Sequence, residues 1–412
     1  MDDKLRKFLK RLRKDYESRP IYIVSAPGRV DFLNTHQDYK GLPVVPIAIN
    51  LRTYIAAIKT PEDEVIIESL NVKDMGLEYK DSFSKDMPEL RERGWFGNYF
   101  RGIIRTLKDL GYAVNRGIHA VLWSEVPMGA GLGSSAALEV AFLKLVCKVN
   151  SIDLSKKEIA EIAYMAEHDI CGIPCGRLDQ YASSYGGAIL LHTRPPYRVE
   201  KLPIGEVPMV VVDSGIRHSV ADIHPRRQLE IDRGIAQLKA IPYLSESLRA
   251  KLGNNYSDTK WELIEEYEIL PYLTEIDSSS AKRILFTIKM NNSTNIAIRL
   301  IKNKKLPKEC LGIIGGSEDE DYLSLLGKIL NLQHVLLRDL YEVSLPMIER
   351  LRDRIIEAGA LGVKISGAGM GGALIAICRK ENLDRIVKVA YEYGSPMSIP
   401  VIPDEGVDIV YP

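Results

Sequence analysis

The first half of the chain alternates between short apolar runs and stretches in which apolar residues recur with a helical period. Short apolar runs bounded by Gly, Pro or polar residues are typical of strands, and an apolar residue at every third or fourth position is typical of a helix. These patterns predict strands at residues 21–26, 44–49, 53–58, 64–69, 119–124 and 186–192. They predict helices at residues 5–12, 95–107, 136–149, 155–168 and 180–184.

The second half shows a different order of elements. A strand at 209–213 is followed by a basic turn at 217–227, and residues from about 230 to 330 are mostly helical and charged. Strands at 361–366 and 373–378 enclose a glycine turn at 367–372. Because Pro195-Pro196 marks a boundary after the last strand of the first half, we expect two domains, residues 1–192 and 193–412.

The composition is that of an ordinary globular protein, with 46% apolar and 27% charged residues among 412. Lys plus Arg and Asp plus Glu are balanced at 55 each, so nothing in the overall charge favours nucleic acid or an anionic membrane as partner. We expect the partner to be a small molecule. The helix at 5–12 has a basic outer face, which we interpret as a solvated surface.

From the lack of a recognisable targeting signal and from the cysteine usage, we expect a cytoplasmic protein. The N-terminus has no apolar segment of the signal-peptide kind, and no uncharged run long enough to span a membrane occurs. Five cysteines spread along a long chain do not form a disulfide framework. Cys171 and Cys175 form a single pair with no second ligand pair, so a zinc site is the weaker interpretation.

The stretch from 126 to 137 is a glycine-rich loop that runs from a strand into a helix. Gly129, Gly131 and Gly133 allow the backbone N–H groups to converge on one point, and a helix N-terminus favours an anion there. Ser134 and Ser135 add two hydroxyls. The loop lacks the Gly-Lys-Ser/Thr ending of a Walker A motif, so the residues alone leave a phosphate site and a tight structural turn equally open.

Polar side chains crowd the segment from 27 to 41, which the pattern predicts to be a long loop between two strands. Within it lie Arg29, Asp31, His36, Asp38 and Tyr39. A loop so rich in hydrogen-bonding groups, held by strands at both ends, suits recognition of a polyhydroxylated ligand. The alternative is a solvated loop without a ligand.

Two carboxylates and two aromatic residues are further candidates. Glu167 and Asp179 flank a Gly/Pro turn, and one of them is suited to hold a metal ion while the other accepts a proton. Surface charge is the plainer interpretation of both. Trp95 or Tyr99 is suited to stack on an adenine, although aromatic residues at helical spacing more often belong to a core.

The order of three motifs resembles that of the GHMP kinases. They are the Pro-Gly-Arg segment at 27–29, the Pro-x-Gly-x-Gly-Leu-Gly-Ser-Ser loop at 127–135 and the Ser-Gly-Ala-Gly-x-Gly-Gly turn at 366–372. Within that superfamily the chain is most similar to the galactokinase family. The segments 166–180 and 334–344 are similar to that family's catalytic segment and to one of its late helices, so the resemblance covers nearly the whole chain.

This resemblance implies a two-domain α+β fold, with an N-terminal domain like ribosomal protein S5, a ferredoxin-like C-terminal domain and the site between them. It implies an ATP-dependent sugar kinase that phosphorylates a hydroxyl, expected to be the anomeric one, of galactose or a related hexose, with Mg²⁺ as cofactor. Asp179 becomes the candidate base, with Arg29 beside it. The ATP-binding residues that it implies are Pro127, Gly129, Ala130, Gly131, Leu132, Gly133, Ser134 and Ser135, with Trp95 at the base. Ser135 and Glu167 would hold the metal. The implied sugar-binding residues are Arg29, His36, Asp38, Gly176 and Asp179. We add Thr35 and Arg177, at positions where this chain has its own residues, as further candidates for the sugar.

Several positions depart from the galactokinase pattern. Asp31 replaces an Asn, Asn34 a Gly and Thr35 a Glu that in the family meets the hydroxymethyl end of the sugar, while Ile223 stands where a Tyr is expected. Arg177 adds a cation. Less negative charge there suggests an alternative substrate, an acidic or C6-modified sugar such as a uronic acid or a sugar phosphate. Otherwise Thr35 binds a neutral hexose and Arg177 pairs with a carboxylate.

Two other function classes compete with a kinase. The spacing Gly367-x-Gly369-x-x-Gly372 fits the dinucleotide fingerprint of a dehydrogenase, but a strand follows it where that fingerprint requires a helix. A catalytically silent sensor that binds ATP and sugar is the other. The presence of Arg29, Glu167 and Asp179 together argues for an active enzyme.

Overall fold

The structure is a computed structural model and describes residue 10 and residues 21–216 and 220–410. Apart from residue 10, the helix predicted at 5–12 lies outside the described residues. So do residues 217–219 of the predicted basic turn. No helix in the described part of the chain is long and apolar enough to cross a membrane.

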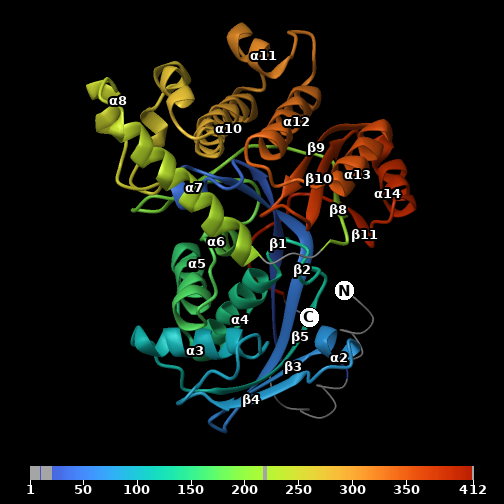
Figure 1. Cartoon of the computed structure of the whole chain (residues 1–412). Helices are drawn as coiled ribbons and strands as arrows, with labels where there is room; N and C mark the ends of the chain where they lie inside the picture. Colours follow the sequence, from blue (N-terminus) through green and yellow to red (C-terminus); the bar gives the residue numbers. More distant parts are fainter. Residues whose placement is uncertain (1–9, 11–20, 217–219, 411–412) are drawn as a thin grey trace.

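A mixed sheet organises the first half of the chain (Figure 1). In the part that the structure describes, its six strands follow the order β12-β1-β2-β5-β3-β4, and β3 runs parallel to β5. Their bounds are β1 (Ile21–Leu33), β2 (Val45–Thr60), β3 (Glu64–Ser69), β4 (Lys80–Ser84), β5 (Gly117–Ser124) and β12 (Asp408–Ile409). The predicted strands at 44–49 and 53–58 are thus one strand, Val45–Thr60, whose two parts both pair with β1 on either side of a bulge.

The predicted loop at 27–41 is a loop only in its second part. Strand β1 continues to Leu33 with two bulges, pairing Arg29 with Ala48 and Asp31 with Pro46 on β2. The prediction of a loop at 27–33 was wrong because the polar residues hid a period of two. Val30 and Phe32 point into the core, so Arg29 and Asp31 share the opposite face of the strand.

Helices α3 to α6 gather on one side of the large sheet (Figure 1), and α4 packs against both β1 and β2. The helices of this half are α2 (Leu70–Asp74), α3 (Asn98–Asp109), α4 (Ser134–Asn150), α5 (Lys156–Met165) and α6 (Leu178–Tyr185). The helix predicted to reach 168 ends as an α-helix at Met165 and continues as a π-helical turn, Ala166–Ile170. Trp95 lies just before α3 and not within it.

A second, antiparallel sheet forms the centre of the second half, in the order β11-β8-β10-β9. Its strands are β8 (Met209–Asp213), β9 (Ala360–Ser366), β10 (Ala373–Cys378) and β11 (Met397–Val401). The helices α12 (Tyr322–Asp339), α13 (Pro346–Glu357) and α14 (Leu383–Glu392) pack on it. Since β9 and β10 are antiparallel neighbours, the turn at 367–372 is strand, turn, strand, and the dehydrogenase interpretation is wrong.

The α+β fold is confirmed, and one core joins its two halves. A single hydrophobic cluster includes Phe32 and Ile47 of the first sheet with Val211 and Ile375 of the second. The small sheet of β6 (Ile189–His192) and β7 (Arg198–Lys201) pairs across the boundary predicted after residue 192. That boundary stays a prediction.

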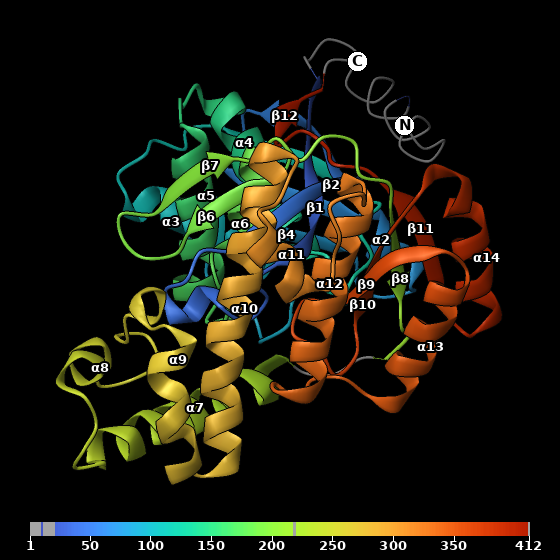
Figure 2. The same ribbon diagram turned by 90° about the horizontal axis from the view of Figure 1, so that it is seen from above.

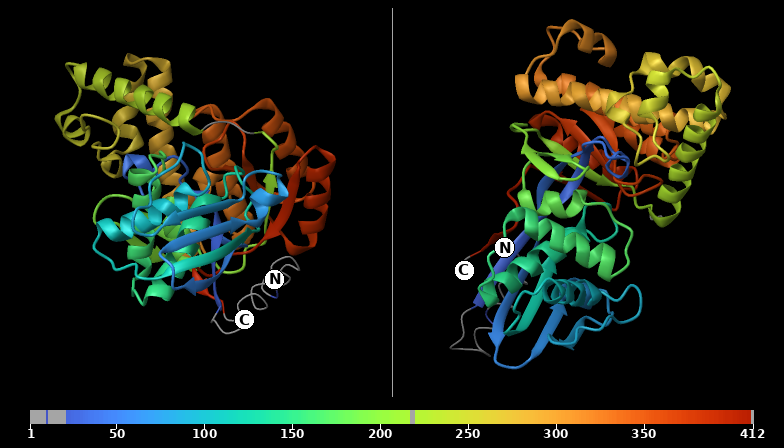
Figure 3. Two further views of the ribbon diagram at one scale, coloured as in Figure 1. Left: turned by 90° about the horizontal axis from the view of Figure 1, so that it is seen from below. Right: turned by 90° about the vertical axis from the view of Figure 1, so that its left-hand side faces the viewer.

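Helices dominate residues 230–330, as the sequence predicts. They are α7 (Val220–Ala240), α8 (Glu246–Lys251), α9 (Glu266–Ile269), α10 (Ser278–Asn303) and α11 (Lys308–Ile314). In the right-hand view of Figure 3 they lie at the end of the molecule opposite β3 and β4, and Figure 2 shows α10 beside α12. The prediction of a turn at 217–227 was wrong, because α7 already begins at Val220 and contains Pro225.

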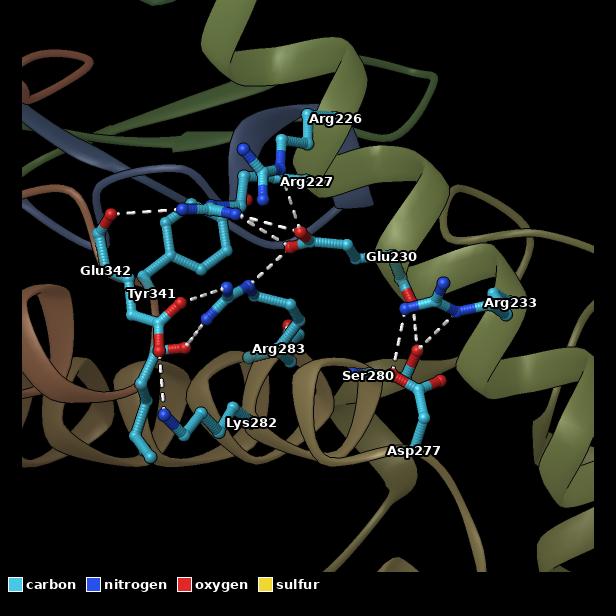
Figure 4. A network of polar contacts seen from close by, with 12 residues as sticks. Arg226, Arg227, Glu230, Arg233, Asp277, Ser280, Lys282, Arg283, Tyr341 and Glu342 are labelled. Carbon is cyan, nitrogen blue, oxygen red and sulfur yellow. Dashed lines mark hydrogen bonds and ion pairs between the residues drawn. The ribbon is translucent and has the colours of Figure 1, made fainter.

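Ion pairs and hydrogen bonds of charged side chains connect α7 with α10 and with the segment that follows α12 (Figure 4). Arg283 of α10 donates to Glu230 at 2.6 Å and to Glu342 at 2.6 Å, and its side chain is 1% exposed. Arg227 of α7 donates to Glu230 at 2.8 Å. Glu230 thus joins two buried cations, which fixes how the first turns of α7 sit against the rest of the second half.

We predict that Glu230→Gln lowers the free energy of unfolding by about 2–3 kcal/mol, because Gln leaves the buried Arg283 and Arg227 cations less well compensated. Urea denaturation followed by circular dichroism measures this change. The matched control is Glu318→Gln, in an exposed pair with Lys308, which should change the free energy by less than about 0.5 kcal/mol.

The same pair of variants has a pH signature. The ion pairs hold the pKa of Glu230 below its usual range despite burial, and hydrogen bonds from Lys282 and Arg283 lower the pKa of Glu342 to about 2. Carboxylates with a depressed pKa in the folded state stabilise above the unfolded pKa, near 4.5, and lose that contribution as the pH falls below it. Between about pH 5 and about pH 3, the free energy of unfolding of Glu230→Gln should therefore fall by less than that of the unchanged chain. Equal losses in both would contradict the assignment.

Candidate functional site

The glycine loop before α4 has the backbone conformation that an anion site needs. Gly129, Gly131 and Gly133 have φ values of 69°, 73° and 70°, in the left-handed region that other residues rarely adopt. Ser134 begins α4, so the unpaired N–H groups of the first helical turn face the loop. The geometry expected of a phosphate-binding loop is present, while its ligand stays a prediction.

The glycine turn between β9 and β10 packs directly on this loop. A Cβ added to Gly131 would lie 3.4 Å from the carbonyl oxygen of Ser366, and one added to Gly372 would lie 3.7 Å from that of Ala130. An added Cβ at either position would thus be in van der Waals contact with the other turn. Two of the three motifs, more than 230 residues apart by 366 − 131, are therefore in contact.

Arg29 connects the glycine loop with α6. Its backbone N–H donates to the Leu132 carbonyl at 2.8 Å, and its Nη1 donates to the carbonyl of Gly131. Its Nε and Nη2 donate to the two carboxylate oxygens of Asp179 at 2.7 and 2.6 Å, a bidentate ion pair. The Asp179 side chain, in the first turn of α6, keeps 28% exposure and can meet a ligand.

The ion pair keeps Arg29 charged although the residue is buried. Burial lowers the pKa of Arg29, but the charge and hydrogen bond of Asp179 together raise it by more, so the net shift of the pKa is upward. Gly133 stands beside the pair, since a Cβ there would lie 3.1 Å from Cγ of Arg29. The loop, the arginine and the carboxylate therefore form one rigid unit.

Asp38 and His36 bring the remainder of the first motif to this unit. Burial raises the pKa of Asp38, and the charge of Asp179 raises it further. Gly176 lies against Asp38, because a Cβ on Gly176 would be 2.3 Å from Asp38 Oδ2. Nε2 of His36 is 3.0 Å from the carbonyl oxygen of Ala368 in the second glycine turn.

Two residues that the sequence did not single out, Lys364 and His224, belong to the same group. Nζ of Lys364 donates to Oγ1 of Thr35 at 2.6 Å, and the His224 ring lies edge-on to that of His36 with centroids 5.1 Å apart. Burial lowers the pKa of Lys364 to about 8, against the opposing charge of Asp31. Lys364 had a detectable signal, since it is the one charged residue in the apolar run 361–366. For His224 the signal was indirect, since it follows Ile223, which stands where the galactokinase pattern has a Tyr.

Glu167 and Ser135 lie together on the other side of the glycine loop. Gln180 donates to Oε2 of Glu167 at 2.6 Å. Burial and the charge of Asp179 raise the pKa of Glu167, whereas a hydrogen bond from Ser135 lowers it. Glu139 of α4, which the sequence did not indicate either, is buried beside Glu167, and burial raises its pKa well above the usual range.

A carboxylate and a hydroxyl next to a phosphate site fit Mg²⁺, which is commonly held by one or two carboxylates together with substrate phosphates. Within the part of the chain that the structure describes, no cluster of three or more His, Cys, Asp or Glu side chains is arranged to hold a metal ion. This excludes an all-protein cage from the described region and leaves room for a metal shared with a phosphate.

Trp95 lines a cavity of about 260 Å³. The cavity is also lined by Tyr99 and Cys171, and the Trp95 Nε1 atom is buried without a hydrogen-bond partner in the described structure. Burial raises the pKa of Tyr99, and the charge of Glu167 raises it further. The cavity therefore lies between the start of α3 and the segment that follows Glu167.

Arg177, predicted at the sugar, makes its contacts elsewhere. Its Nε donates to both carboxylate oxygens of Glu161 at 3.1 Å. Its guanidinium lies 3.8 Å from the ring centroid of Tyr164 and 4.1 Å from that of Tyr197. The structure does not bring Arg177 to the group formed by Arg29, Asp38 and Asp179, because a carboxylate and two aromatic faces already hold its charge.

Three family models match the chain. The model described as GHMP kinases N terminal domain matches residues 98–187, and the GHMP kinases C terminal model matches residues 320–395. The galactokinase galactose-binding signature matches residues 10–59. The matched segments contain the glycine loop, the second glycine turn and the Arg29 strand.

Curated relatives of similar length are galactokinases. The galactokinase of Clostridium perfringens strain SM101 is 29% identical over 380 residues, which cover 91% of this chain and 90% of that protein. The galactokinase of Clostridium beijerinckii is 28% identical over 398 residues, covering 94% of this chain and 92% of the relative.

Solved structures of GHMP kinases share the fold. Lactococcus lactis galactokinase complexed with galactose superposes with a TM-score of 0.77 at 22% identity, over 98% of this chain and 99% of that chain. Mevalonate kinase from Methanococcus jannaschii superposes with a TM-score of 0.66 at 18% identity, over 95% and 100%. At these identities the likeness establishes the fold.

We predict that Gly133→Ala lowers the free energy of unfolding by about 1–2 kcal/mol, because alanine is strained at φ 70° and its Cβ crowds Arg29. Thermal or urea denaturation measures the change. The matched control is Gly312→Ala in α11, where nothing lies within 4 Å of an added Cβ. That variant should be as stable as the unchanged chain or gain up to about 1 kcal/mol. A Gly133→Ala protein as stable as the control would contradict the strain argument.

Proposed function

Because the chain belongs to the GHMP kinase superfamily and is a sugar kinase of the galactokinase type, we propose that it transfers the γ-phosphoryl group of ATP to the anomeric hydroxyl of galactose or a closely related hexose. The observation that carries this proposal is the contact of Arg29 with both the glycine loop and Asp179. In this proposal the phosphates bind at the glycine loop and the acceptor hydroxyl at Asp179, and the guanidinium of Arg29 contacts both.

The glycine loop would bind the phosphates of ATP. Its N–H groups and the first turn of α4 supply donors and a positive dipole end, which stabilise phosphate charge without a lysine in the loop. The residues proposed for this role are Pro127, Gly129, Ala130, Gly131, Leu132, Gly133, Ser134 and Ser135. The adenine would occupy the cavity that Trp95 and Tyr99 line.

Ser135 and Glu167 would hold Mg²⁺ together with the phosphates. When bound, Mg²⁺ neutralises negative charge on the phosphates during transfer. Glu167 is oriented for this by Gln180, which occupies one of its carboxylate oxygens. Mg²⁺ at this site remains part of the proposal.

Asp179 would orient the acceptor hydroxyl and take its proton as the new bond to phosphorus forms. Arg29 binds both oxygens of this carboxylate, and it can also stabilise charge that develops on the transferred group. The attack is in line, so catalysis depends mainly on positioning. The bidentate contact supplies that positioning, because it fixes both oxygens of Asp179.

The sugar would lie against the residues around this pair. His36, Asp38 and Gly176 surround it, and Gly176 has no Cβ to displace the Asp38 carboxylate. Thr35 is held by Lys364, so its predicted contact with the sugar stays a proposal. Arg177 pairs with Glu161, which favours a neutral hexose over the acidic sugar that its charge suggested.

A substrate panel tests the proposed function. ATP-dependent ADP release is measured with galactose, glucose, galacturonate, glucuronate and galactose 6-phosphate, and the phosphorylated position is identified by NMR. We expect the highest kcat/KM with galactose or a close neutral relative and a product phosphorylated at the anomeric carbon. The absence of turnover with every neutral sugar would falsify the proposal.

We predict that Asp179→Asn lowers kcat by about 10²- to 10⁴-fold, because the amide can neither accept the proton nor pair with Arg29. The KM for ATP and the dissociation constant of an ATP analogue should change by less than about threefold, since the loop contacts of Arg29 remain. The matched control, Asp319→Asn at an exposed position, should leave both constants unchanged. Undiminished turnover in Asp179→Asn excludes the assigned role.

A further inference from the structure

Arg177 immediately precedes helix α6, whose second residue is Asp179. The carbonyl oxygen of Arg177 accepts the first hydrogen bond of the helix, from the N–H of Tyr181 at 3.1 Å. Its side chain makes no capping hydrogen bond to the first turn in the described structure. Many helices begin with a side chain that caps the free N–H groups of this turn, so the start of α6 is held by other contacts.

The segment that leads into α6 has no regular secondary structure. The π-helical turn ends at Ile170 and α6 begins at Leu178. Gly172, Pro174 and Gly176 lie between them, and Gly172 has a φ of 65°. A segment with two glycines does little to fix the direction of the helix that follows it. The orientation of the first turn of α6 therefore depends on side-chain contacts.

The Arg177 side chain makes such contacts with α5 and with the residue before β7. Its Nε donates to both carboxylate oxygens of Glu161 on α5 at 3.1 Å. The guanidinium carbon lies 3.8 Å from the ring centroid of Tyr164 and 4.1 Å from that of Tyr197. A planar guanidinium packs against aromatic rings and is attracted to them, and with 24% exposure of the side chain this attraction is partly shielded from water.

Glu161 also binds a residue one turn into α6. The hydroxyl of Tyr181 donates to Oε1 of Glu161, and Tyr181 is fully buried. Residues four positions apart lie on the same face of a helix, so Arg177 and Tyr181 both reach α5. One carboxylate therefore holds the residue before α6 and a residue of the helix at once.

Asp179 lies between these two contacts in the sequence. Arg29 holds its carboxylate at 2.7 and 2.6 Å from strand β1. This ion pair fixes the two carboxylate oxygens relative to Arg29, whereas the backbone of α6 is placed by the contacts with α5. The direction in which the carboxylate faces a ligand depends on both.

We propose that Arg177 is a positioning residue for Asp179, and that its contacts with Glu161, Tyr164 and Tyr197 hold the start of α6 so that the carboxylate faces the acceptor hydroxyl. This inference rests on the function proposed above and adds a residue that does not touch the substrate. The cation by which this chain departs from the galactokinase pattern thus acts through Asp179, and not on the charge of the sugar.

The expected effect is on turnover and not on nucleotide binding. A displacement of about 1 Å of a group that must face the reacting atom costs up to about 100-fold in rate. ATP binding in the proposed function depends on the glycine loop, and none of the described hydrogen bonds or ring contacts of the Arg177 side chain is to that loop. Loss of the Arg177 contacts should therefore lower kcat and leave the KM for ATP as it is.

Two substitutions of Arg177 test the proposal. Arg177→Gln removes the cation, and kcat with the preferred sugar should fall about 5- to 50-fold while the KM for ATP changes less than about twofold. Arg177→Lys keeps the charge without the planar guanidinium, so kcat should recover in part, to about 2- to 5-fold below that of the unchanged enzyme. The matched control is Arg354→Gln on α13, since Arg354 also pairs with a glutamate, Glu357 at 2.8 Å, and lies 5.0 Å from the ring centroid of Tyr393. It should leave kcat unchanged.

The Asp179→Asn background separates positioning from a general structural defect. If Arg177 acts through the Asp179 carboxylate, Arg177→Gln should lower kcat by less than about twofold once Asn replaces that carboxylate. A lower fraction of folded enzyme would lower kcat by the same factor in both backgrounds, and this result would overturn the inference. Should Arg177→Gln fail to fold, Arg177→Lys takes its place in the comparison.

Glu161→Gln tests the same chain of contacts from α5. It should lower kcat at least as much as Arg177→Gln, because it affects the contacts of both Arg177 and Tyr181. The double variant should lose no more than Glu161→Gln alone, since the two residues act as one unit. Multiplication of the two losses would show independent roles and contradict the inference.

Failure of this inference is distinguishable from failure of the proposed function. An unchanged enzyme that phosphorylates no neutral sugar overturns the proposed function, and the role of Arg177 with it. Normal turnover in the unchanged enzyme with an unaltered kcat in both Arg177 variants overturns the inference alone. So does a raised KM for the sugar at constant kcat, because that result places Arg177 at the sugar.

Discussion

The bidentate ion pair between Arg29 and Asp179 is the interaction on which the rest of the site depends. The two residues are 150 positions apart in the sequence, and both are mostly buried. Solvent therefore screens their charges weakly, and the attraction between them is strong. Arg29 cannot move without disturbing the glycine loop, because its backbone and side chain both bind loop carbonyls. A buried charge that had lost its partner would be costly, and this cost keeps strand β1, the loop before α4 and the start of α6 in one arrangement.

Small residues make this arrangement geometrically feasible. The segment before α6 leaves no space for a Cβ on Gly176 next to Asp38, and the glycine loop and the turn between β9 and β10 are in van der Waals range of each other. The ion network around Glu230 and Arg283 holds α7 in place, and α7 carries His224 to His36. The first half thus supplies the glycine loop, Arg29 and Asp179, and the second half adds Lys364 and His224 to the residues of the first motif.

The sequence predicted the elements whose patterns are strictly local. Helix α4 and the strands on either side of the second glycine turn follow from apolar periodicity, and the order of three motifs identified the family. It mispredicted residues 27–33, because a strand that carries Arg29 and Asp31 on one of its faces has the composition of a loop. Lys364 and His224 were missed for a related reason. Their partners Thr35 and His36 are more than 180 residues away in the sequence, so the lone charge of Lys364 in an apolar run marks it as unusual without showing what it contacts.

The short strand β12 places residues near 409 against residues near 24, with Val24 opposite Ile409. The chain also returns to the first sheet through the bridges of Ile49 with Pro403 and Gly186 with Glu405. The edge of the sheet that carries Arg29 is therefore completed only by segments that a ribosome makes hundreds of residues later. Contacts of such long range slow folding, because distant segments must come together before the contacts form. The first sheet is therefore complete only after residues 403–409 have paired with it.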